Sequence, residues 1–447
     1  MMETTSTVRI YPSPPLHGIV YPPSSKYHTL RSIVAALLAT GSSVIRGPAE
    51  SDDTDVLVNV CRQLGGSLRY SETLLRAGEP QTLLVSGTDG RIQSPSGGVL
   101  DVGNAGAVLR LLLGICALSP EPITLTTPYP ESLGRRPNAD LLQALSQLGA
   151  RIECDSPEGR LPIRIQRGGL RGGKVRISGK KSSQYISSLL FLAPLLEEGL
   201  EIEIVDGLAS ASFVDLTIQV LQEAGITVIE KQRHSHYMVP GGQQYRPMDY
   251  TIPGDYPSAA ALLAAVAVAK GEITIANLRP DGGQGKALLE VFSNMGVHIV
   301  HNGSTLIAHA QEPLRGINCS GEAVIDSVPV IVAAACFANQ SSRIDNIANL
   351  RLKESDRIYE LAQELNALGC QVIPSNDALE IVPVGANGVH GGVTVDAHSD
   401  HRLIQALSIA GLASKQPVTI THAEHIAKSY PRFFADLSSL GAKIEWI

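Results

Sequence analysis

A short charged segment in the C-terminal half carries side chains that can bind an anion and move protons. It spans residues 351–357 and reads RLKESDR. We expect it to open a helix, with Lys353 and Arg357 on one face, because residues four apart are neighbours on a helix surface. Like charges at that spacing cost roughly 0.2–0.5 kcal/mol, which a bound anion would remove. The alternative is an ordinary solvated charged face.

A second cationic segment precedes a proline. In Arg135-Arg136-Pro137 we expect the proline at the first helical position and Arg136 in extended backbone at the helix start, where an anion can bind. An exposed arginine at a loop end is the alternative. Arg402 and Lys428 hold comparable places near the C-terminus. Arginine offers a planar fork to a carboxylate or phosphate, and lysine a point charge.

Six polar motifs each precede a largely apolar segment, as expected at the start of a buried helix. Helix N-termini expose unpaired N–H groups and a partial positive charge, so several of them in one place would form an anion site. Ordinary helix capping is the alternative, and for Ser182 and Ser183 alone it is favoured. The motifs are Ser25-Lys26, Gly103-Asn104-Ala105-Gly106, Ser182-Ser183-Gln184, Gly254-Asp255, Asp326-Ser327 and Asp400-His401-Arg402.

A glycine pattern indicates the elements that position these motifs. An apolar-x-x-apolar-Gly-x-x-apolar pattern follows a helical apolar period and precedes a short β-rich stretch. The glycine is expected to end its helix in the left-handed conformation. Six copies at a near-constant interval predict an array of α/β units. The glycines are Gly65, Gly149, Gly225, Gly296, Gly369 and Gly441.

Loop signals near 16–23 and 240–254 suggest two crossings between domains of three repeats each. We therefore predict one domain over residues 23–251 and a second over 1–22 plus 252–447. The first repeat begins directly after the earlier crossing, so we expect the N-terminal strand to pair with the second domain.

The composition excludes several classes of protein. The chain has 447 residues, 44% apolar and 18% charged, with a net charge of −7. Such a chain buries large cores, and its acidity argues against a nucleic-acid partner. We see no secretory signal, and the longest apolar run, 259–269, is well short of the roughly 20 residues that span a bilayer. We expect a soluble cytoplasmic protein, and we expect free thiols because none of the six cysteines forms a C-x-x-C pair.

Taken together, the motifs resemble the 5-enolpyruvylshikimate-3-phosphate synthase family of the enolpyruvyl transferases. The resemblance covers nearly the whole chain, and the order and spacing of the pieces are more specific than any one of them. It rests on Ser25-Lys26, Arg31, Ser51-Asp52-Asp53-Thr54, Gly103-Asn104-Ala105-Gly106, Arg136-Pro137, Ser182-Ser183-Gln184, Asp326, Asn349, Lys353-Glu354-Ser355-Asp356-Arg357, Asp400-His401-Arg402 and Ala427-Lys428.

The resemblance implies two binding subsites. The phosphoenolpyruvate site would comprise Lys26, Gly106, Arg136, Gln184, Arg357, Arg402 and Lys428. The acceptor site would comprise Arg31, Ser182, Ser183, Gln184, Ser210, Asp326, Asn349 and Lys353. Catalysis would fall to Asp326, Glu354 and Lys26.

The implied reaction transfers the enolpyruvyl group of phosphoenolpyruvate to the 5-hydroxyl of shikimate 3-phosphate. The resemblance also implies an α/β fold of the inside-out barrel type, with two domains, each of three βαβαββ repeats, that close on substrate at a site between them. It implies no cofactor, and we expect a monomer. Four positions depart from the family pattern: Tyr27 replaces a small serine, Phe213 a tyrosine, Ala107 a threonine and Lys286 an acidic residue.

Three other functions are alternatives to this enolpyruvyl transfer. The UDP-N-acetylglucosamine enolpyruvyl transferases carry a cysteine five residues before their Arg-Pro, where this chain has Glu131. A paralogue acting on another phosphorylated acceptor, such as a nucleotide, stays open because one fold serves several substrates. A non-catalytic binding protein would be expected to lack Asp326, Glu354 and Lys26.

Two further patterns suggest a ligand only weakly. His234-Ser235-His236 and the pair His398 and His401 lack a third metal ligand at a sensible spacing, so no metal is expected. The segment 282–286, GGQGK, lacks the spacing and the hydroxyl residue of a phosphate-binding P-loop.

Overall fold

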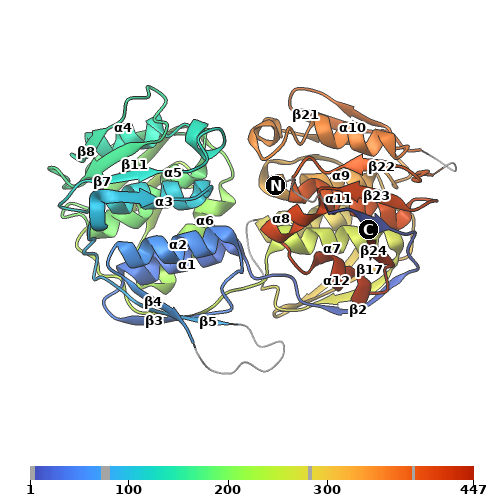
Figure 1. Ribbon diagram of the computed structural model, residues 1–447, viewed down its shortest axis with the longest axis horizontal. Coiled ribbons are helices and arrows are strands. Elements are labelled where there is room, and N and C mark those ends of the chain that lie inside the picture. Colours follow the sequence, from blue (N-terminus) through green and yellow to red (C-terminus); the bar gives the residue numbers. More distant parts are fainter. Residues whose placement is uncertain (1–5, 72–80, 280–283, 385–387) are drawn as a thin grey trace. The chain divides into compact units, whose positions relative to one another are not determined.

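The computed structural model describes residues 6–71, 81–279, 284–384 and 388–447. The chain forms two compact units (Figure 1). Unit 2 is Ser24–Ile252, and unit 1 is Pro253–Ile447 together with the chain up to Pro23. Each has its own apolar core.

Unit 2 contains helices and strands in an alternating order. Its helices are α1 (Lys26–Leu38), α2 (Asp52–Gln63), α3 (Gly106–Cys116), α4 (Ala139–Gln147), α5 (Ser183–Leu192) and α6 (Ser212–Glu223). Its strands are β3 (Ser42–Arg46), β4 (Ser67–Tyr70), β5 (Thr82–Ser86), β6 (Val99–Asp101), β7 (Ile123–Thr126), β8 (Arg151–Glu153), β9 (Ile163–Gln166), β10 (Gly173–Gly179), β11 (Leu200–Leu208), β12 (Ile229–Gln232), β13 (His236–Val239) and β14 (Asp249–Thr251).

Unit 1 repeats this order and begins with two strands from the N-terminus. Its helices are α7 (Tyr256–Ala269), α8 (Gln284–Asn294), α9 (Val328–Ala335), α10 (Tyr359–Ala367), α11 (His401–Ala413) and α12 (Phe433–Ser439). Its strands are β1 (Val8–Ile10), β2 (Leu16–Val20), β15 (Gly271–Ile275), β16 (His298–Asn302), β17 (Thr305–Ala310), β18 (Asn318–Ser320), β19 (Ser342–Asp345), β20 (Val372–Pro374), β21 (Ala378–Ile381), β22 (Thr394–Asp396), β23 (Val418–Thr421) and β24 (Ile444–Trp446).

Within the described residues each unit has three four-stranded sheets of one topology. Their orders are β14-β3-β5-β4, β6-β7-β9-β8 and β10-β11-β13-β12 in unit 2, and β16-β17-β15-β2, β18-β19-β21-β20 and β22-β23-β1-β24 in unit 1. In β6-β7-β9-β8 the first pair is parallel and the other two are antiparallel. Each sheet with its two helices is thus a βαβαββ repeat, as predicted.

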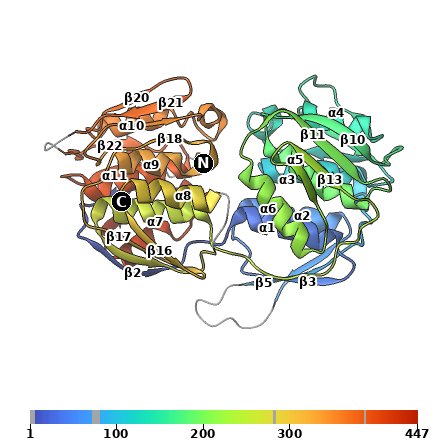
Figure 2. The same cartoon turned by 180° about the vertical axis from the view of Figure 1, so that it is seen from behind.

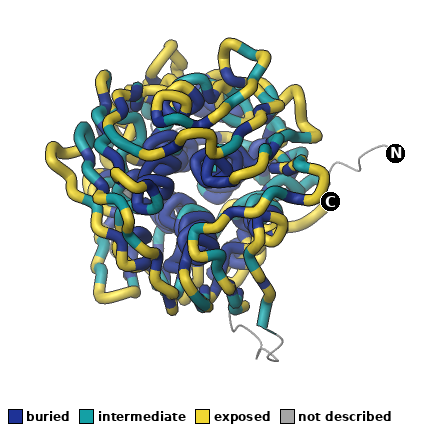
Figure 3. Tube along the Cα trace, turned by 90° about the vertical axis from the view of Figure 1, so that its left-hand side faces the viewer, coloured by how far each residue is buried: buried dark blue, intermediate teal, exposed yellow. Residues whose placement is uncertain are grey.

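The first helix of each repeat is buried and the second is amphipathic. All of α7 is buried, which suits its almost wholly apolar sequence. In α3 and α5 small residues allow close approach, and a Cβ at Gly114 would lie 2.7 Å from Ser188 Oγ. Buried segments gather in the interior and exposed turns at the rim (Figure 3). With the sheets on the outside, this is the inside-out α/β architecture that the sequence predicts.

Several sequence predictions about the elements are confirmed. All six repeat glycines follow a helix and have a positive φ, between 78° and 110°. The N-terminal strands pair with unit 1, β1 with β23 and β24, and β2 with β15. Figure 2 shows β2 beside the strands of unit 1.

Three local predictions are wrong. Segment 351–357 does not open a helix, because a 3-10 turn at Ala348–Leu352 precedes extended backbone at Lys353, and α10 begins at Tyr359. Pro137 is not the first residue of α4, which begins two residues later after Asn138. The stretches expected to be loops at both crossings each contain a strand, β2 and β14, because each completes a sheet of its own unit.

Candidate functional site

In unit 1 the predicted residues assemble around one buried arginine. Arg357 Nε donates to Asp400 Oδ2 at 2.7 Å and Nη2 to Glu354 Oε2 at 2.6 Å, and Nη1 lies 3.5 Å from Asp326 Oδ1. The pairing explains why 353–358 is irregular: the backbone must bring Glu354 and Arg357 beside Asp326, in the 3-10 turn before α9, and beside Asp400, the N-cap of α11.

Two lysines complete what we call the Arg357 cluster, defined as Asp326, Lys353, Glu354, Arg357, Asp400 and Lys428. Lys353 Nζ donates to Asp326 Oδ1 at 3.0 Å, and Lys428 Nζ lies 2.7 Å from Glu354 Oε1. The cluster therefore pairs three cations with three carboxylates.

The charges within the cluster reinforce one another. Burial alone would lower the pKa of Arg357, but the carboxylates of Asp400 and Glu354 raise it above its ordinary value. Burial alone would raise the pKa of Glu354, but the charges of Arg357 and Lys428 hold it well below its ordinary value. Glu354 is thus ionised at neutral pH in the ligand-free protein.

Arg402 is placed to receive an anion. It lies in the first turn of α11, where the N-cap Asp400 accepts from its backbone N–H at 2.8 Å. Its Nη1 donates to Gln405, whereas its buried Nε has no hydrogen-bond partner among the described residues. A buried unsatisfied donor on a cation indicates a place for an absent acceptor. The neighbouring His401 is buried, which lowers its pKa well below the ordinary value, so we expect a neutral ring.

In unit 2 the predicted residues form three groups besides the Lys26–Asp53 pair. Lys26, at the start of α1, donates to Asp53 Oδ2 at 3.1 Å. Arg136 lies in extended backbone, as predicted, and its guanidinium packs against the start of α3, where a Cβ on Gly106 would be 2.7 Å from Nη1. The described residues offer the Arg136 guanidinium no carboxylate within ion-pair distance.

The start of α5 is tied to α3 by an arginine that the sequence reasoning missed. Arg110 Nη1 donates to Gln184 Oε1 at 2.9 Å and approaches Ser182 Oγ at 3.4 Å. Ser182 also caps α5 by accepting from the Gln184 N–H. The available signal was that Arg110 is the single charged residue of α3.

Arg31 forms the third group. Its Nε donates to Thr217 Oγ1 at 2.7 Å, and its Nη1 and Nη2 donate to the Tyr27 and Phe213 carbonyls. Burial lowers the pKa of Arg31 to about 10, and the group stays charged at neutral pH. Three of its five N–H donors are used, which leaves two for a carboxylate.

Two of the departures from the family pattern contact each other. The Tyr27 and Phe213 rings lie 4.5 Å apart between centroids, tilted by 45°. The two departures therefore lie in the same part of unit 2. Ala107 lies within α3, and Lys286 is exposed on α8, 3.9 Å from Glu290.

Three predicted residues lie outside the contacts described above. Ser183 is the first residue of α5 and is buried. Asn349 is exposed in the 3-10 turn before Lys353, and Ser210 lies in a left-handed turn before α6, where its carbonyl accepts from the Phe213 N–H. Gly282 and Gly283 of the glycine-rich segment lie outside the described residues.

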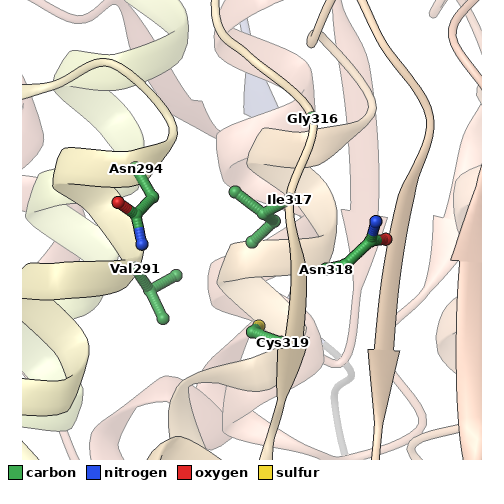
Figure 4. A pocket seen from close by; sticks show the side chains of 6 residues that line it. All are labelled: Val291, Asn294, Gly316, Ile317, Asn318 and Cys319. Carbon is green, nitrogen blue, oxygen red and sulfur yellow. The ribbon is translucent and has the colours of Figure 1, made fainter.

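A small hollow in unit 1 is unrelated to these groups. It holds about 240 Å³ and lies between α8 and the segment around β18, where Val291 and Asn294 face Ile317 and Cys319 (Figure 4). It contains none of the charged residues described above. No helix in the described parts of the chain is long and apolar enough to cross a membrane.

The fold and the candidate site define a class: a six-repeat α/β protein with cationic and polar side chains at the starts of several helices. The profile of the family described as EPSP synthase (3-phosphoshikimate 1-carboxyvinyltransferase) matches residues 10–437. The chain belongs to this family.

Relatives and solved structures agree with this assignment. A 3-phosphoshikimate 1-carboxyvinyltransferase of Deinococcus radiodurans is 39% identical over 446 residues, covering 100% of this chain and 98% of the relative. One of Methanosarcina acetivorans is 36% identical, covering 96% and 97%. A solved EPSP synthase of Acinetobacter baumannii has the same fold, with a TM-score of 0.85 at 24% identity over 99% of this chain and 100% of that one.

Proposed function

We infer that this chain is a carboxyvinyl transferase that moves the enolpyruvyl group of phosphoenolpyruvate to the 5-hydroxyl of shikimate 3-phosphate and releases phosphate. This is the shikimate-pathway step toward chorismate and the aromatic amino acids. Family membership over almost the whole chain carries the inference. A paralogue acting on a nucleotide is not favoured, because relatives matched over their full length bear the shikimate name.

The chemistry requires a proton at C3 of phosphoenolpyruvate and removal of a proton from the attacking hydroxyl. Protonation at C3 makes C2 electrophilic, the hydroxyl adds, and the tetrahedral ketal then loses phosphate and a C3 proton. We assign hydroxyl deprotonation to Asp326 and transfer at C3 to Glu354 or Lys26.

The contacts of Glu354 support a substrate-dependent role. A general acid needs a pKa near the working pH, whereas Arg357 and Lys428 hold the pKa of Glu354 far below it in the free protein. Phosphoenolpyruvate would draw these two cations to its own charges. Glu354 would then hold a proton more readily, so binding would prepare the acid.

Lys353 supports a parallel role at the acceptor. It donates to Asp326 Oδ1 in the free protein. The phosphate of the acceptor, held also by Ser182, Ser183 and Ser210, would draw Lys353 toward itself. The Asp326 oxygen would then be available to the hydroxyl.

We further propose that both units bind the same phosphoenolpyruvate molecule. Lys26, Gly106, Arg136 and Gln184 would contribute from unit 2, and Arg357, Arg402 and Lys428 from unit 1. The same cations would hold together two polyanions that otherwise repel each other. Cytoplasmic location and the monomeric state stay predictions from the sequence.

A phosphate-release assay with phosphoenolpyruvate and a panel of phosphorylated alcohols tests the function and its sharing between the units. We expect turnover with shikimate 3-phosphate. Arg136→Ala in unit 2 and Arg402→Ala in unit 1 should each raise the KM for phosphoenolpyruvate, because each removes a charge-assisted contact worth roughly 1.5–3 kcal/mol, or about 10- to 100-fold. Circular dichroism checks that both variants fold.

Two outcomes would count against these proposals. Turnover of another phosphorylated alcohol, with none of shikimate 3-phosphate at saturation, would establish the paralogue instead. An unchanged KM in either arginine variant would remove that unit from the phosphoenolpyruvate site.

The Tyr27–Phe213 pair should reshape the acceptor pocket without changing the reaction. Relative to the family serine, Tyr27 moves one hydroxyl away from the acceptor. A lost hydrogen bond to a charged group costs roughly 1.5–3 kcal/mol. Tyr27→Ser with Phe213→Tyr should therefore leave kcat similar and change the KM for shikimate 3-phosphate by at most about 10- to 100-fold.

The single variants provide the control for this pair. Because the two rings touch, the effects of Tyr27→Ser and Phe213→Tyr on KM should not add. Additive effects, or a kcat reduced by more than tenfold in the double variant, would show that the pair does not act as one unit of the pocket.

A further inference from the structure

A histidine and two carboxylates converge in unit 2, away from the residues assigned to catalysis. His234, in the turn between β12 and β13, has its Nε2 atom 3.0 Å and 3.1 Å from the two Asp215 oxygens. Glu230 on β12 accepts a hydrogen bond from the backbone N–H of His234 at 2.7 Å. One ligand atom from each of the three residues lies within 4.8 Å of the others. Among the described residues they are the one such histidine–carboxylate group.

A buried hydroxyl faces the same place. Tyr237 on β13 pairs with Glu230 across the hairpin. Its side chain is fully buried, and its hydroxyl interacts with the Glu230 carboxylate.

The His234–Asp215 spacing is close to that of two ligand atoms in a tetrahedral metal site. Two ligand atoms that each lie about 2.0–2.1 Å from zinc at a tetrahedral angle are roughly 3.3 Å apart. The His234–Asp215 distances are shorter by only a few tenths of an ångström. The side chains of Asp215 and His234 are 34% and 29% exposed, so an ion and its water can enter from solvent.

His236 and His398 do not have this geometry. His236 Nε2 contacts the single carboxylate of Glu201 at 2.8 Å. His398 faces Glu364 with Nε2 and Glu360 with Nδ1, at 3.1 Å and 4.0 Å. The two nitrogens of the His398 ring point in different directions, so His398, Glu360 and Glu364 cannot bind one ion together.

We propose that Asp215, Glu230 and His234 form a binding site for Zn²⁺ or a similar late first-row metal ion. Imidazole nitrogen with carboxylate oxygen favours such ions, whereas Mg²⁺ and Ca²⁺ prefer oxygen alone. A fourth ligand would be water. The expectation of no metal rested on local spacing, and Asp215 lies too far from His234 in the chain to enter that pattern.

The site would stabilise the scaffold that holds Arg31. Asp215 lies in the first turn of α6 between Phe213 and Thr217, and these two residues accept hydrogen bonds from Arg31. A metal ion would tie this turn to the β12–β13 hairpin. The role is structural, because none of the three ligands belongs to the proposed substrate site.

Calorimetric titration of EDTA-treated full-length protein with ZnCl₂ tests the proposal. We expect one stoichiometric site that is lost in His234→Ala and Asp215→Asn and retained in His236→Ala. Zinc at 100 times its Kd should also raise the melting temperature of the parent, since it would add about 2.7 kcal/mol of stability. The His234→Ala melting temperature should not respond to zinc, and MgCl₂ should leave both unchanged.

Cobalt provides a readout that needs no variant. Co²⁺ added to the parent protein should give the visible absorption of a tetrahedral nitrogen–oxygen site, and zinc should remove it. Absence of stoichiometric zinc binding would overturn the proposal, as would equal binding by the parent and His234→Ala. His234 and Asp215 would then form only an ion pair. Phosphate release by His234→Ala is measured separately from zinc binding, so failure of the metal-site proposal can be distinguished from failure of the proposed transferase activity.

Discussion

Asp400→Ala is expected to lower the free energy of unfolding of unit 1 by about 3–5 kcal/mol, the cost of removing one partner of a buried ion pair. Asp400 is fully buried and Arg357 is 1% exposed. The variant leaves the guanidinium without its two shortest Asp400 contacts, at 2.7 Å and 3.1 Å. It also removes the N-cap of α11, worth typically about 1 kcal/mol.

Urea denaturation followed by tryptophan fluorescence measures this effect. The chain has one tryptophan, and Trp446 lies on β24 of unit 1, so the signal reports that unit even if the two units unfold separately. Asp400→Asn should fall between the parent and the alanine variant, because the amide oxygen can still cap the helix. The matched control is Glu380→Ala, which breaks the exposed Arg343–Glu380 pair of the same unit and should cost no more than about 1 kcal/mol.

Equal losses in Asp400→Ala and Glu380→Ala would contradict the central role given to the Arg357–Asp400 pair. A large loss confined to Asp400→Ala, with Asp400→Asn like the parent, would instead assign the effect to capping and hydrogen bonding.

The repeat architecture was predictable because its signals are local. A glycine directly after an amphipathic helix is a clear signal that the helix ends there, and this signal occurs six times. The βαβαββ order within each unit is implied by the family resemblance rather than by the glycine pattern. The pairing of strands far apart in the chain is only partly predictable: the sequence assigns the N-terminal strand to the second domain, but it predicts loops where β2 and β14 lie. Their partners lie more than 200 residues away, in β15 and β3.

The family resemblance predicts which residues form the candidate site. It does not predict which of these residues pair with one another. Lys353 and Arg357 were placed on one helix face, yet pairing with Asp326, Glu354 and Asp400 keeps that backbone irregular. Helical propensity over seven residues is weak compared with a buried ion-pair network. Arg110 and the group Asp215, Glu230 and His234 were missed for the same reason, because their partners meet only after folding.

Asp326→Asn is expected to lower kcat by about 10²- to 10⁴-fold, the usual contribution of a positioned general base. The substitution is nearly isosteric, so the amide oxygen can still accept from Lys353, whose Nζ lies 3.0 Å from Oδ1. What it removes is the ability to take the hydroxyl proton. The KM values for both substrates should therefore change much less than kcat, which phosphate release under saturating substrates would measure.

Two comparisons separate a base from a group that only orders the cluster. Asp326→Glu keeps a carboxylate one methylene further out and should recover part of the lost kcat, whereas a variant defective only in folding would not be rescued in this way. Trp446 fluorescence during urea denaturation shows whether Asp326→Asn is as stable as the parent. If the stable asparagine variant retains kcat within tenfold of the parent, Asp326 is not the base. Glu354, joined to Arg357 and Lys428 in the same cluster, would then be the carboxylate left to accept the hydroxyl proton.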